Sequence, residues 1–162
     1  MFTIGEIIDL AIRIERNGEE IYRKAARAVL IPSLASLLVW LADQELEHEK
    51  WFMELKNRVV NTVEAPSLEA MGKKILQTVL GNEAFTLKDA DFSRMEDIID
   101  LLSLALEFEK DTILFYEMLA AFIDDGQLQQ QLEKIIEEEQ RHVGKLEQFL
   151  ETDQLPEGMD AS

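Results

Sequence analysis

The sequence contains no cysteine, so these residues cannot form disulfide bonds, thiolate metal sites or iron–sulfur clusters. It also has only three prolines and seven glycines in 162 residues. Because these two residues most often interrupt helices, their scarcity favours long helices. No stretch approaches the roughly 18–20 consecutive apolar residues of a membrane span. Residues 1–14 lack the basic start of a signal peptide, and we expect a cytoplasmic protein.

Positive charge is scarce as well. Sixteen lysines and arginines stand against 33 acidic residues, which gives a formal net charge of −17. This excess of negative charge argues against binding to nucleic acid or to an anionic membrane surface, because both require basic patches. Hydrophobic residues nevertheless make up 47% of the chain. That share is enough for a sizeable core and argues against an acidic disordered segment.

Histidine occurs only twice, and each histidine follows a glutamate by three residues. The pairs are Glu45 with His48 and Glu139 with His142. On a helix, side chains three residues apart share a face, with about 5–6 Å between their Cβ atoms. A carboxylate and an imidazole on one face together suit a metal ion. The two pairs therefore predict a metal site.

The two pairs lie 94 residues apart, and the same offset relates other positions. Glu15 falls on Glu109, and Tyr22 falls on Tyr116. The same offset superposes residues 7–55 on residues 101–149 without a gap. This pattern indicates a duplicated helical hairpin, in which each half offers one glutamate on its first helix and Glu-x-x-His on its second. Four glutamates and two histidines are the ligand set of a dinuclear carboxylate site in a four-helix bundle.

Apolar residues at spacings of three, four and seven predict four long helices, at about residues 3–30, 33–61, 94–123 and from just after the turn at Asp124–Gly126 to about 151. The connection over about 62–93 is predicted to hold one short amphipathic helix, with Leu68, Met71, Ile75 and Val79 on one face. A crossover along the length of a bundle needs such a long connection. We expect one domain over residues 1–151 and a polar tail over 152–162.

On the second helix, Glu49 is expected to face solvent.

The six candidate ligands fall on helix faces that are otherwise apolar, where a carboxylate is costly unless it is paired or binds a metal. The alternative is a structural bundle whose glutamates are ordinary surface charge. Carboxylates with one imidazole per ion suit iron or manganese, with zinc as an occupant in vitro. We expect Glu45 and Glu139 to bridge the two ions and Glu15 and Glu109 to be terminal ligands. His48 and His142 are each expected to bind one ion.

Tyr22 and Tyr116 each lie seven residues after a terminal glutamate, about 10 Å along the helix axis. Their hydroxyl groups are candidates to hydrogen-bond a ligand carboxylate from another helix. Simple packing inside the bundle is the other interpretation. Gly18 lies one turn after Glu15, where it either creates space beside the site or allows a close helix crossing.

The segments Ala-Ile-Arg-Ile-Glu15 to Tyr22 and Ala-Leu-Glu-Phe-Glu109 to Tyr116, with the two Glu-x-x-His pairs, resemble the rubrerythrin-like branch of the ferritin-like superfamily. The resemblance covers nearly the whole chain except the connection. It implies an all-α, ferritin-like four-helix bundle with two iron ions at the six positions named above. It also implies a reaction with hydrogen peroxide or dioxygen in defence against oxidative stress.

The sequence departs from that branch in two ways. Rubrerythrins proper carry a rubredoxin domain with cysteine-bound iron, and these 162 residues contain no cysteine. Rubrerythrins also have a further carboxylate one turn after the glutamate that corresponds to Glu109, where this chain has Thr112. The resemblance therefore implies an external electron donor, such as a rubredoxin.

Two other functions stay open. One is a ferritin-like ferroxidase or iron-storage subunit, and the other is a non-catalytic helical protein with a structural metal. We also expect a homodimer, because Trp40, Trp51 and the apolar face of the connection offer material for an interface.

Overall fold

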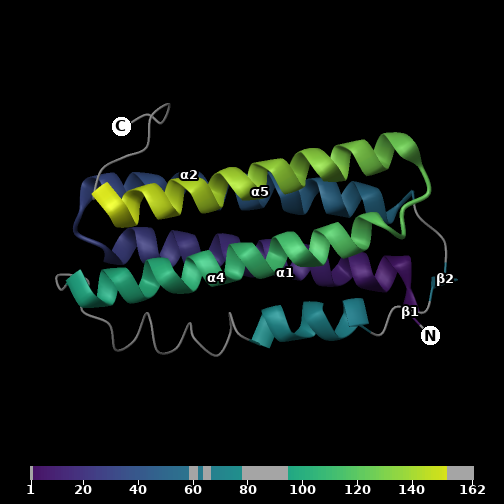
Figure 1. Cartoon of the computed structure of the whole chain (residues 1–162), viewed down its shortest axis with the longest axis horizontal. Coiled ribbons are helices and arrows are strands. Elements are labelled where there is room, and N and C mark those ends of the chain that lie inside the picture. Colours follow the sequence, from purple (N-terminus) through teal and green to yellow (C-terminus); the bar gives the residue numbers. More distant parts are fainter. Residues whose placement is uncertain (1, 59–61, 64–66, 78–94, 153–162) are drawn as a thin grey trace.

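Four long helices form a bundle in the computed structural model, which describes residues 2–58, 62–63, 67–77 and 95–152 (Figure 1). They are α1 (Ile4–Ala28), α2 (Pro32–Lys56), α4 (Met95–Ala120) and α5 (Gly126–Thr152). A further helix covers residues 67–77. The prediction of an all-α four-helix bundle with a short helix in the connection is thus confirmed. Among the described helices, none is both long and apolar enough to cross a membrane.

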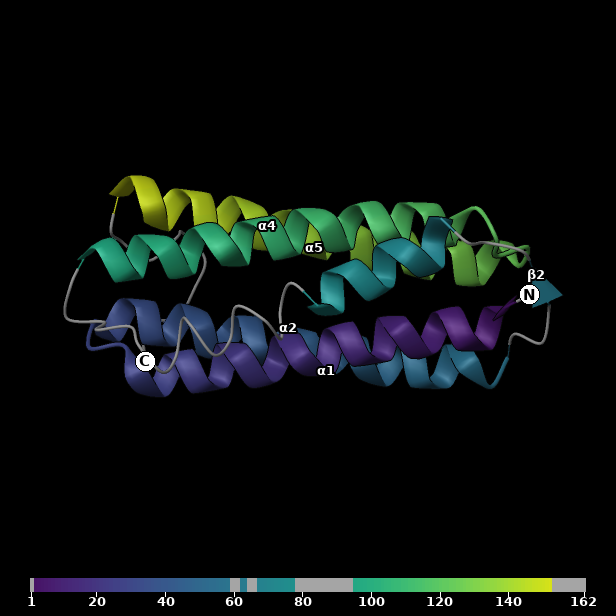
Figure 2. The same ribbon diagram turned by 90° about the horizontal axis from the view of Figure 1, so that it is seen from below.

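The bundle consists of two helical hairpins that lie in two layers, α1 with α2 and α4 with α5 (Figure 2). Helix α2 ends at the end of the bundle where the chain begins, whereas α4 begins at the opposite end (Figure 1). The connection between them therefore has to span the length of the bundle, as predicted. Pro32 and Gly126, which begin α2 and α5, are separated by the same offset of 94 that relates the candidate ligands.

Local chemistry sets where the second helix of each hairpin begins. Ile31 precedes α2 in an extended conformation, and Pro32 occupies the first turn, where its missing N–H needs no partner. Before α5, the side chain of Asp125 accepts hydrogen bonds from the backbone N–H groups of Gln127 and Leu128, at 2.9 and 3.1 Å. Asp125 is therefore the N-cap of this helix.

The predicted ends of three helices were too late. Helix α1 ends at Ala28 rather than near residue 30, and α4 ends at Ala120 rather than near 123. Helix α2 ends at Lys56 rather than near residue 61, because the N–H groups of Asn57 and Arg58 bond carbonyls three residues back and tighten the chain into a turn. Hydrophobic spacing does not register such turns.

Two short strands were not predicted. β1 (Phe2–Thr3) pairs antiparallel with β2 (Thr62–Val63), so that the chain beyond α2 returns to the segment before α1. Strands of two residues are too short to show an alternating pattern, and only the tertiary arrangement brings them together. The predicted tail over 152–162 and the part of the connection over 78–93 lie outside the described residues, apart from Thr152, which ends α5.

The apolar core is divided into two clusters. One lies towards the start of α1 and includes Ile8, Phe52 and Leu132. The other lies towards the α1–α2 turn and includes Leu38 and Phe149. The candidate ligands belong to neither cluster, because they occupy the levels of the four helices between them. The polar centre is therefore closed by apolar packing at both ends.

The apolar face of the connection packs inside the monomer. Leu68 and Ile75 are 1% and 2% exposed within the core cluster that contains Phe52. Buried Gly72 lies so close to α1 and α4 that a Cβ there would be 2.9 Å from the ring of Phe115 and 3.0 Å from Leu10. This face is therefore not free for a subunit interface, and the homodimer stays a prediction.

We predict opposite outcomes for the same substitution at two glycines. Gly144→Ala should stabilise the protein by about 1 kcal/mol, because alanine is the better helix former and a Cβ at this position meets no other atom within 4 Å. Gly72→Ala should lose that gain, because the added methyl group must displace the ring of Phe115. Urea denaturation of both variants tests this. An equal gain at Gly72 would show that the helix over 67–77 does not pack as described.

Candidate metal centre

All four helices of the bundle contribute to one polar centre. Glu15 comes from α1 and Glu109 from α4, while α2 and α5 each supply a glutamate and a histidine. Five of the six side chains have no exposed surface, and the sixth, His48, is 3% exposed. The fold therefore brings every predicted ligand into the interior. They are Glu15, Glu45, His48, Glu109, Glu139 and His142.

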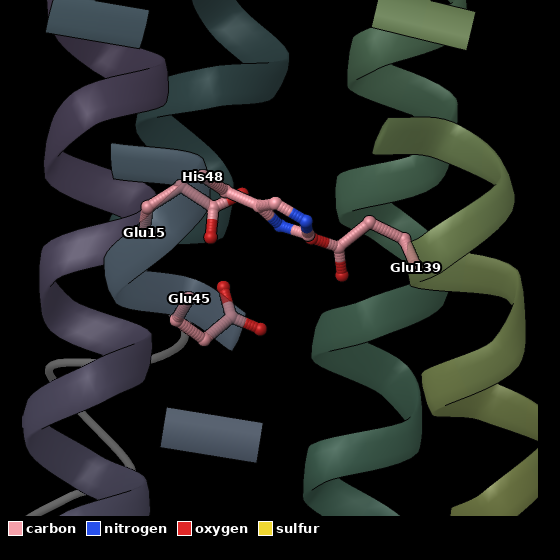
Figure 3. A group of neighbouring side chains, drawn as sticks. All are labelled: Glu15, Glu45, His48 and Glu139. Carbon is pink, nitrogen blue, oxygen red and sulfur yellow. The ribbon is translucent and has the colours of Figure 1, made fainter. Parts of the chain in front are cut away.

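The six residues form two overlapping groups, and within each group the ligand atoms lie within 4.8 Å of one another. The first group contains Glu15, Glu45, His48 and Glu139, which Figure 3 shows as sticks. The second contains Glu45, Glu109, Glu139 and His142. Glu45 and Glu139 belong to both groups and therefore have the positions that bridging carboxylates would need. Each group also holds one terminal glutamate and one histidine.

Many of the potential metal-binding atoms of this centre have no hydrogen-bond partner. Within the part of the chain that the structure describes, seven buried side-chain oxygen and nitrogen atoms have no hydrogen-bond partner, and all belong to the six residues. Nearly all buried polar groups in folded proteins are hydrogen-bonded, so such a concentration needs an explanation. Two cations would satisfy the carboxylate oxygens and one ring nitrogen of His142, and a carboxylate-rich set with one imidazole per ion fits iron or manganese. The atoms are Glu15 Oε2, Glu45 Oε1, Glu45 Oε2, Glu109 Oε2, Glu139 Oε2, His142 Nδ1 and His142 Nε2.

The two tyrosines make reciprocal hydrogen bonds across the bundle. The hydroxyl group of Tyr22 in α1 donates to Oε1 of Glu109 in α4, at 2.6 Å. The hydroxyl group of Tyr116 in α4 donates to Oε1 of Glu15 in α1, at 2.5 Å. Each bond fixes one carboxylate oxygen and leaves the other oxygen unpartnered. Of the two interpretations of the tyrosines, the structure thus supports hydrogen bonding to the ligand carboxylates.

Gly18 is close to both a core ring and a ligand. A Cβ at this position would lie 3.2 Å from the ring of Phe108 and 3.4 Å from Oε2 of Glu45. Both interpretations of Gly18 therefore apply, because its missing side chain allows the approach of α4 and leaves space beside Glu45. The matching position in the second hairpin is Thr112, whose buried hydroxyl group donates to the carbonyl oxygen of Phe108 at 2.8 Å.

Two of the four buried carboxylates, those of Glu45 and Glu109, hold their protons more strongly than usual in the absence of metal. Burial raises the pKa of Glu45 well above its usual value of 4.5, and the charges of Glu139 and Glu15 raise it further. Burial and the charge of Glu139 raise the pKa of Glu109 to about 7. Both shifts express the same cost, since a carboxylate without water or a cation is unstable in the charged form.

The histidines shift in the direction set by the carboxylates around them. Burial alone would lower the pKa of His48, but the charge of Glu15 and hydrogen bonds with Glu138 and Glu139 outweigh it and raise the pKa well above 6.5. Burial of His142 is likewise outweighed by the charge of Glu139, which raises the pKa to about 10. Both imidazoles are therefore protonated near neutral pH without metal, and a bound metal must displace these protons.

Glu138 contacts the centre although the ligand pattern did not include it. Its Oε2 lies 2.7 Å from Nε2 of His48, whose other ring nitrogen lies 2.7 Å from Oε1 of Glu139. The hydrogen bond from His48 lowers the pKa of Glu138, and its direction turns Nδ1 of the ring towards the centre. The matching residue in the first hairpin is Gln44. Comparing the two halves for differences, rather than for matches, would have identified this position.

The expectation that Glu49 faces solvent was wrong. This side chain is buried, and Oε1 accepts a hydrogen bond from Nε of Arg16 at 3.0 Å and lies 2.8 Å from Nη2. The long side chain of Arg16 reaches from α1 to α2, so a position that is polar on an isolated helix becomes covered by the neighbouring one. Helical periodicity cannot show this cover.

Both tryptophans also have partners within the monomer. Trp40 packs edge-on against His142, with ring centroids 5.2 Å apart. Trp51 packs edge-on against Phe52 and donates a hydrogen bond to Gln131 at 2.9 Å. Both side chains remain half-buried, so their part in a subunit interface stays a prediction.

Comparisons with known proteins agree with this geometry. The sequence model of the Rubrerythrin family matches residues 6–89. A crystal structure from Thermotoga maritima, described as that of a candidate ferritin-like diiron-carboxylate protein, superposes with a TM-score of 0.70 at 21% sequence identity. The superposition covers 94% of this chain and 97% of that one, and it establishes the ferritin-like fold. No curated protein matches the chain.

Removing either tyrosine hydroxyl group should weaken metal binding. Tyr22→Phe and Tyr116→Phe each leave one more buried carboxylate oxygen without its donor. We expect the affinity for the ion beside that carboxylate to fall by about 10–100-fold, which is typical for the loss of a hydrogen bond behind a metal ligand. Anaerobic ferrous titration measures this. Because the two bonds are equivalent across the duplication, the two variants should lose similar amounts, and unchanged affinity in both would contradict the role.

Stability without metal should fall as the pH rises. The folded protein holds the proton of Glu109 up to a pKa of about 7 and that of His142 up to about 10, whereas the unfolded chain releases them near 4.5 and 6.5. The stability that these protons provide is complete below the unfolded values and is lost as the pH rises through the folded ones. Metal binding should instead strengthen with pH, because it competes with the same protons.

Thermal unfolding followed by circular dichroism at about pH 6 and about pH 9 tests this expectation. The metal-free protein should melt lower at the higher pH, and added metal should raise the melting temperature most there. Glu109→Gln should reduce the pH dependence, whereas Glu47→Gln, at an exposed position of α2, should not. A metal-free protein that gains stability with pH would contradict the buried, protonated centre.

Proposed function

The chain belongs to the rubrerythrin family, and we propose that it is a di-iron carboxylate protein that reduces hydrogen peroxide with electrons from a separate donor protein. Dioxygen is the second oxidant that such a centre accepts. Manganese is the other metal that the donor set suits. The proposal makes the protein an oxidoreductase that acts in defence against oxidative stress.

The observation that carries the proposal is the sharing of Glu45 and Glu139 between the two ligand groups. Two ions that share carboxylates are held close enough to act on one substrate molecule. When bound, a pair of iron ions supplies the two electrons that an O–O bond accepts as it is cleaved. Reduction of one hydrogen peroxide to two waters consumes two electrons and two protons, so the number of redox ions matches the demand.

The protein's own residues hold this centre in place and limit access to it. The hydroxyl groups of Tyr22 and Tyr116 fix the orientation of the terminal carboxylates. The two apolar clusters above and below exclude water along the bundle axis. Each ligand group contains four side chains, so an ion held there would keep room for a small oxidant.

The electrons have to come from another redox centre. These 162 residues contain no cysteine and therefore cannot hold the rubredoxin-type iron that the family uses. A separate small electron carrier, such as a rubredoxin, is the donor that we propose. Thr112 stands where the family has a further carboxylate, so the proposed mechanism does not use a carboxylate ligand at this position.

The anaerobically loaded diferrous protein should bind about two irons per chain and oxidise faster with hydrogen peroxide than with dioxygen. A reduced electron carrier should then restore the ferrous state and allow repeated consumption of peroxide. Stopped-flow absorbance and a peroxide electrode measure the two steps. Uptake of many irons per chain under air, without sustained peroxide turnover, would instead assign the protein to iron storage.

Matched variants sharpen this test. Glu45→Ala should remove both ions together, because Glu45 belongs to both groups, whereas Glu47→Ala on the exposed face of α2 should leave both in place. Thr112→Glu restores the family's carboxylate and should raise the peroxide rate relative to the dioxygen rate. An unchanged ratio would show that the missing carboxylate does not limit the reaction.

A further inference from the structure

The surroundings of the two histidines differ, although the ligands themselves repeat. His48 lines a surface hollow of about 340 Å³ between α2 and α5, together with Trp51, Lys134 and Glu138. His142 occupies the equivalent position in the other half and has no exposed surface. One end of the dinuclear centre therefore lies against a hollow, and the other lies behind a covered histidine.

A tryptophan and a lysine exchange places between the two halves. Trp40 covers His142 edge-on, and Nζ of Lys145 lies 5.1 Å from the centre of the Trp40 ring. In the duplicated sequence, Trp40 corresponds to Lys134, and Lys145 corresponds to Trp51. The position that supplies the covering ring at His142 thus carries an exposed lysine at His48. Trp51 does not take over the cover, because its ring packs on Phe52.

A carboxylate stands at the inner end of the hollow. The side chain of Glu138 is 22% exposed, and its Oε2 lies 2.7 Å from Nε2 of His48. The next residue in the chain is the bridging candidate Glu139, whose Oε2 is buried without a partner. Glu138 therefore offers an oxygen ligand between solvent and the buried carboxylates. The corresponding residue Gln44 has no charge.

From this asymmetry we infer that the hollow over His48 is the port through which divalent metal ions enter and leave the dinuclear centre. The ion held by the group that contains His48 exchanges with solvent first, and the ion held by the group that contains His142 is enclosed. Glu138 receives the incoming ion before Glu139 does. This inference rests on the dinuclear centre of the proposed function and adds a direction of access to it.

The charges that line the hollow indicate which groups attract a cation. Glu54 and Glu138 balance Arg58 and Lys134 there, and the protonated ring of His48 adds one positive charge, so the entrance itself does not attract cations. The attraction comes from the carboxylate oxygens beyond it, which are buried without partners. The hollow therefore serves as a path for the ion rather than as its binding site. A larger side chain at Lys134 would narrow this path.

The experiment follows the release of cobalt(II), a divalent probe with visible absorption, from the fully loaded protein to an excess of chelator. Release should show two phases of similar amplitude, one for each ion. Lys134→Trp places over His48 the ring that covers His142, and it should slow the fast phase about tenfold, equivalent to about 1.4 kcal/mol of added barrier. The variant should still bind two cobalt ions at equilibrium.

Two further variants make the test specific. Lys50→Trp adds the same ring at an exposed position of α2 that does not line the hollow, and both rates should remain as in the original protein. Trp40→Ala uncovers His142 and should accelerate the slow phase. Circular dichroism spectra confirm that each variant keeps its helices.

The outcomes separate the port from the metal centre. Two bound ions in every variant, with release rates that neither Lys134→Trp nor Trp40→Ala changes, would overturn the port and leave the dinuclear centre intact. Failure of the original protein to bind two cobalt or ferrous ions would overturn the centre itself. A slowed fast phase in Lys134→Trp with an unchanged Lys50→Trp would establish the hollow as the route.

Discussion

Four carboxylates are buried at one level of an apolar bundle, and the rest of the structure is arranged around their mutual repulsion. Glu15, Glu45, Glu109 and Glu139 have no exposed surface. In the metal-free state, protons on Glu45 and on both histidines reduce the repulsion, as the raised pKa values of these groups show. Cations could replace these protons, so the cost of burying the carboxylates without metal favours metal binding at this centre.

The duplication places matching side chains on both sides of the centre. One hairpin supplies two glutamates and a histidine to the candidate centre, and its repeat supplies the same set from the opposite side. The tyrosines tie the two hairpins together, since Tyr22 and Tyr116 each donate to the glutamate of the other half. Neither hairpin could complete the ligand groups alone. The centre can therefore form only where the two hairpins dock.

The same duplication makes departures from symmetry informative. Ligand positions are tied to each other by the need to surround two ions, and they repeat faithfully. Positions that surround the ligands are free to differ. In the repeated sequence Trp40 corresponds to Lys134, and Gln44 corresponds to Glu138. These differences give the two ends of the centre unequal access to solvent, although the inner ligand sets are equivalent.

The sequence by itself determined the four-helix bundle, its long connection and the six residues that meet at its centre. Helical spacing and an internal repeat are local properties, so they can be read along the chain. Only the tertiary structure decided which oxygen each tyrosine bonds, that Glu138 supports His48, and that Arg16 covers Glu49. Each of these contacts joins different helices, and its geometry depends on how the helices are rotated and how closely they pack. The pairing of β1 with β2 has the same origin, because a segment of two residues carries no periodic signal and forms only where the fold brings its partner.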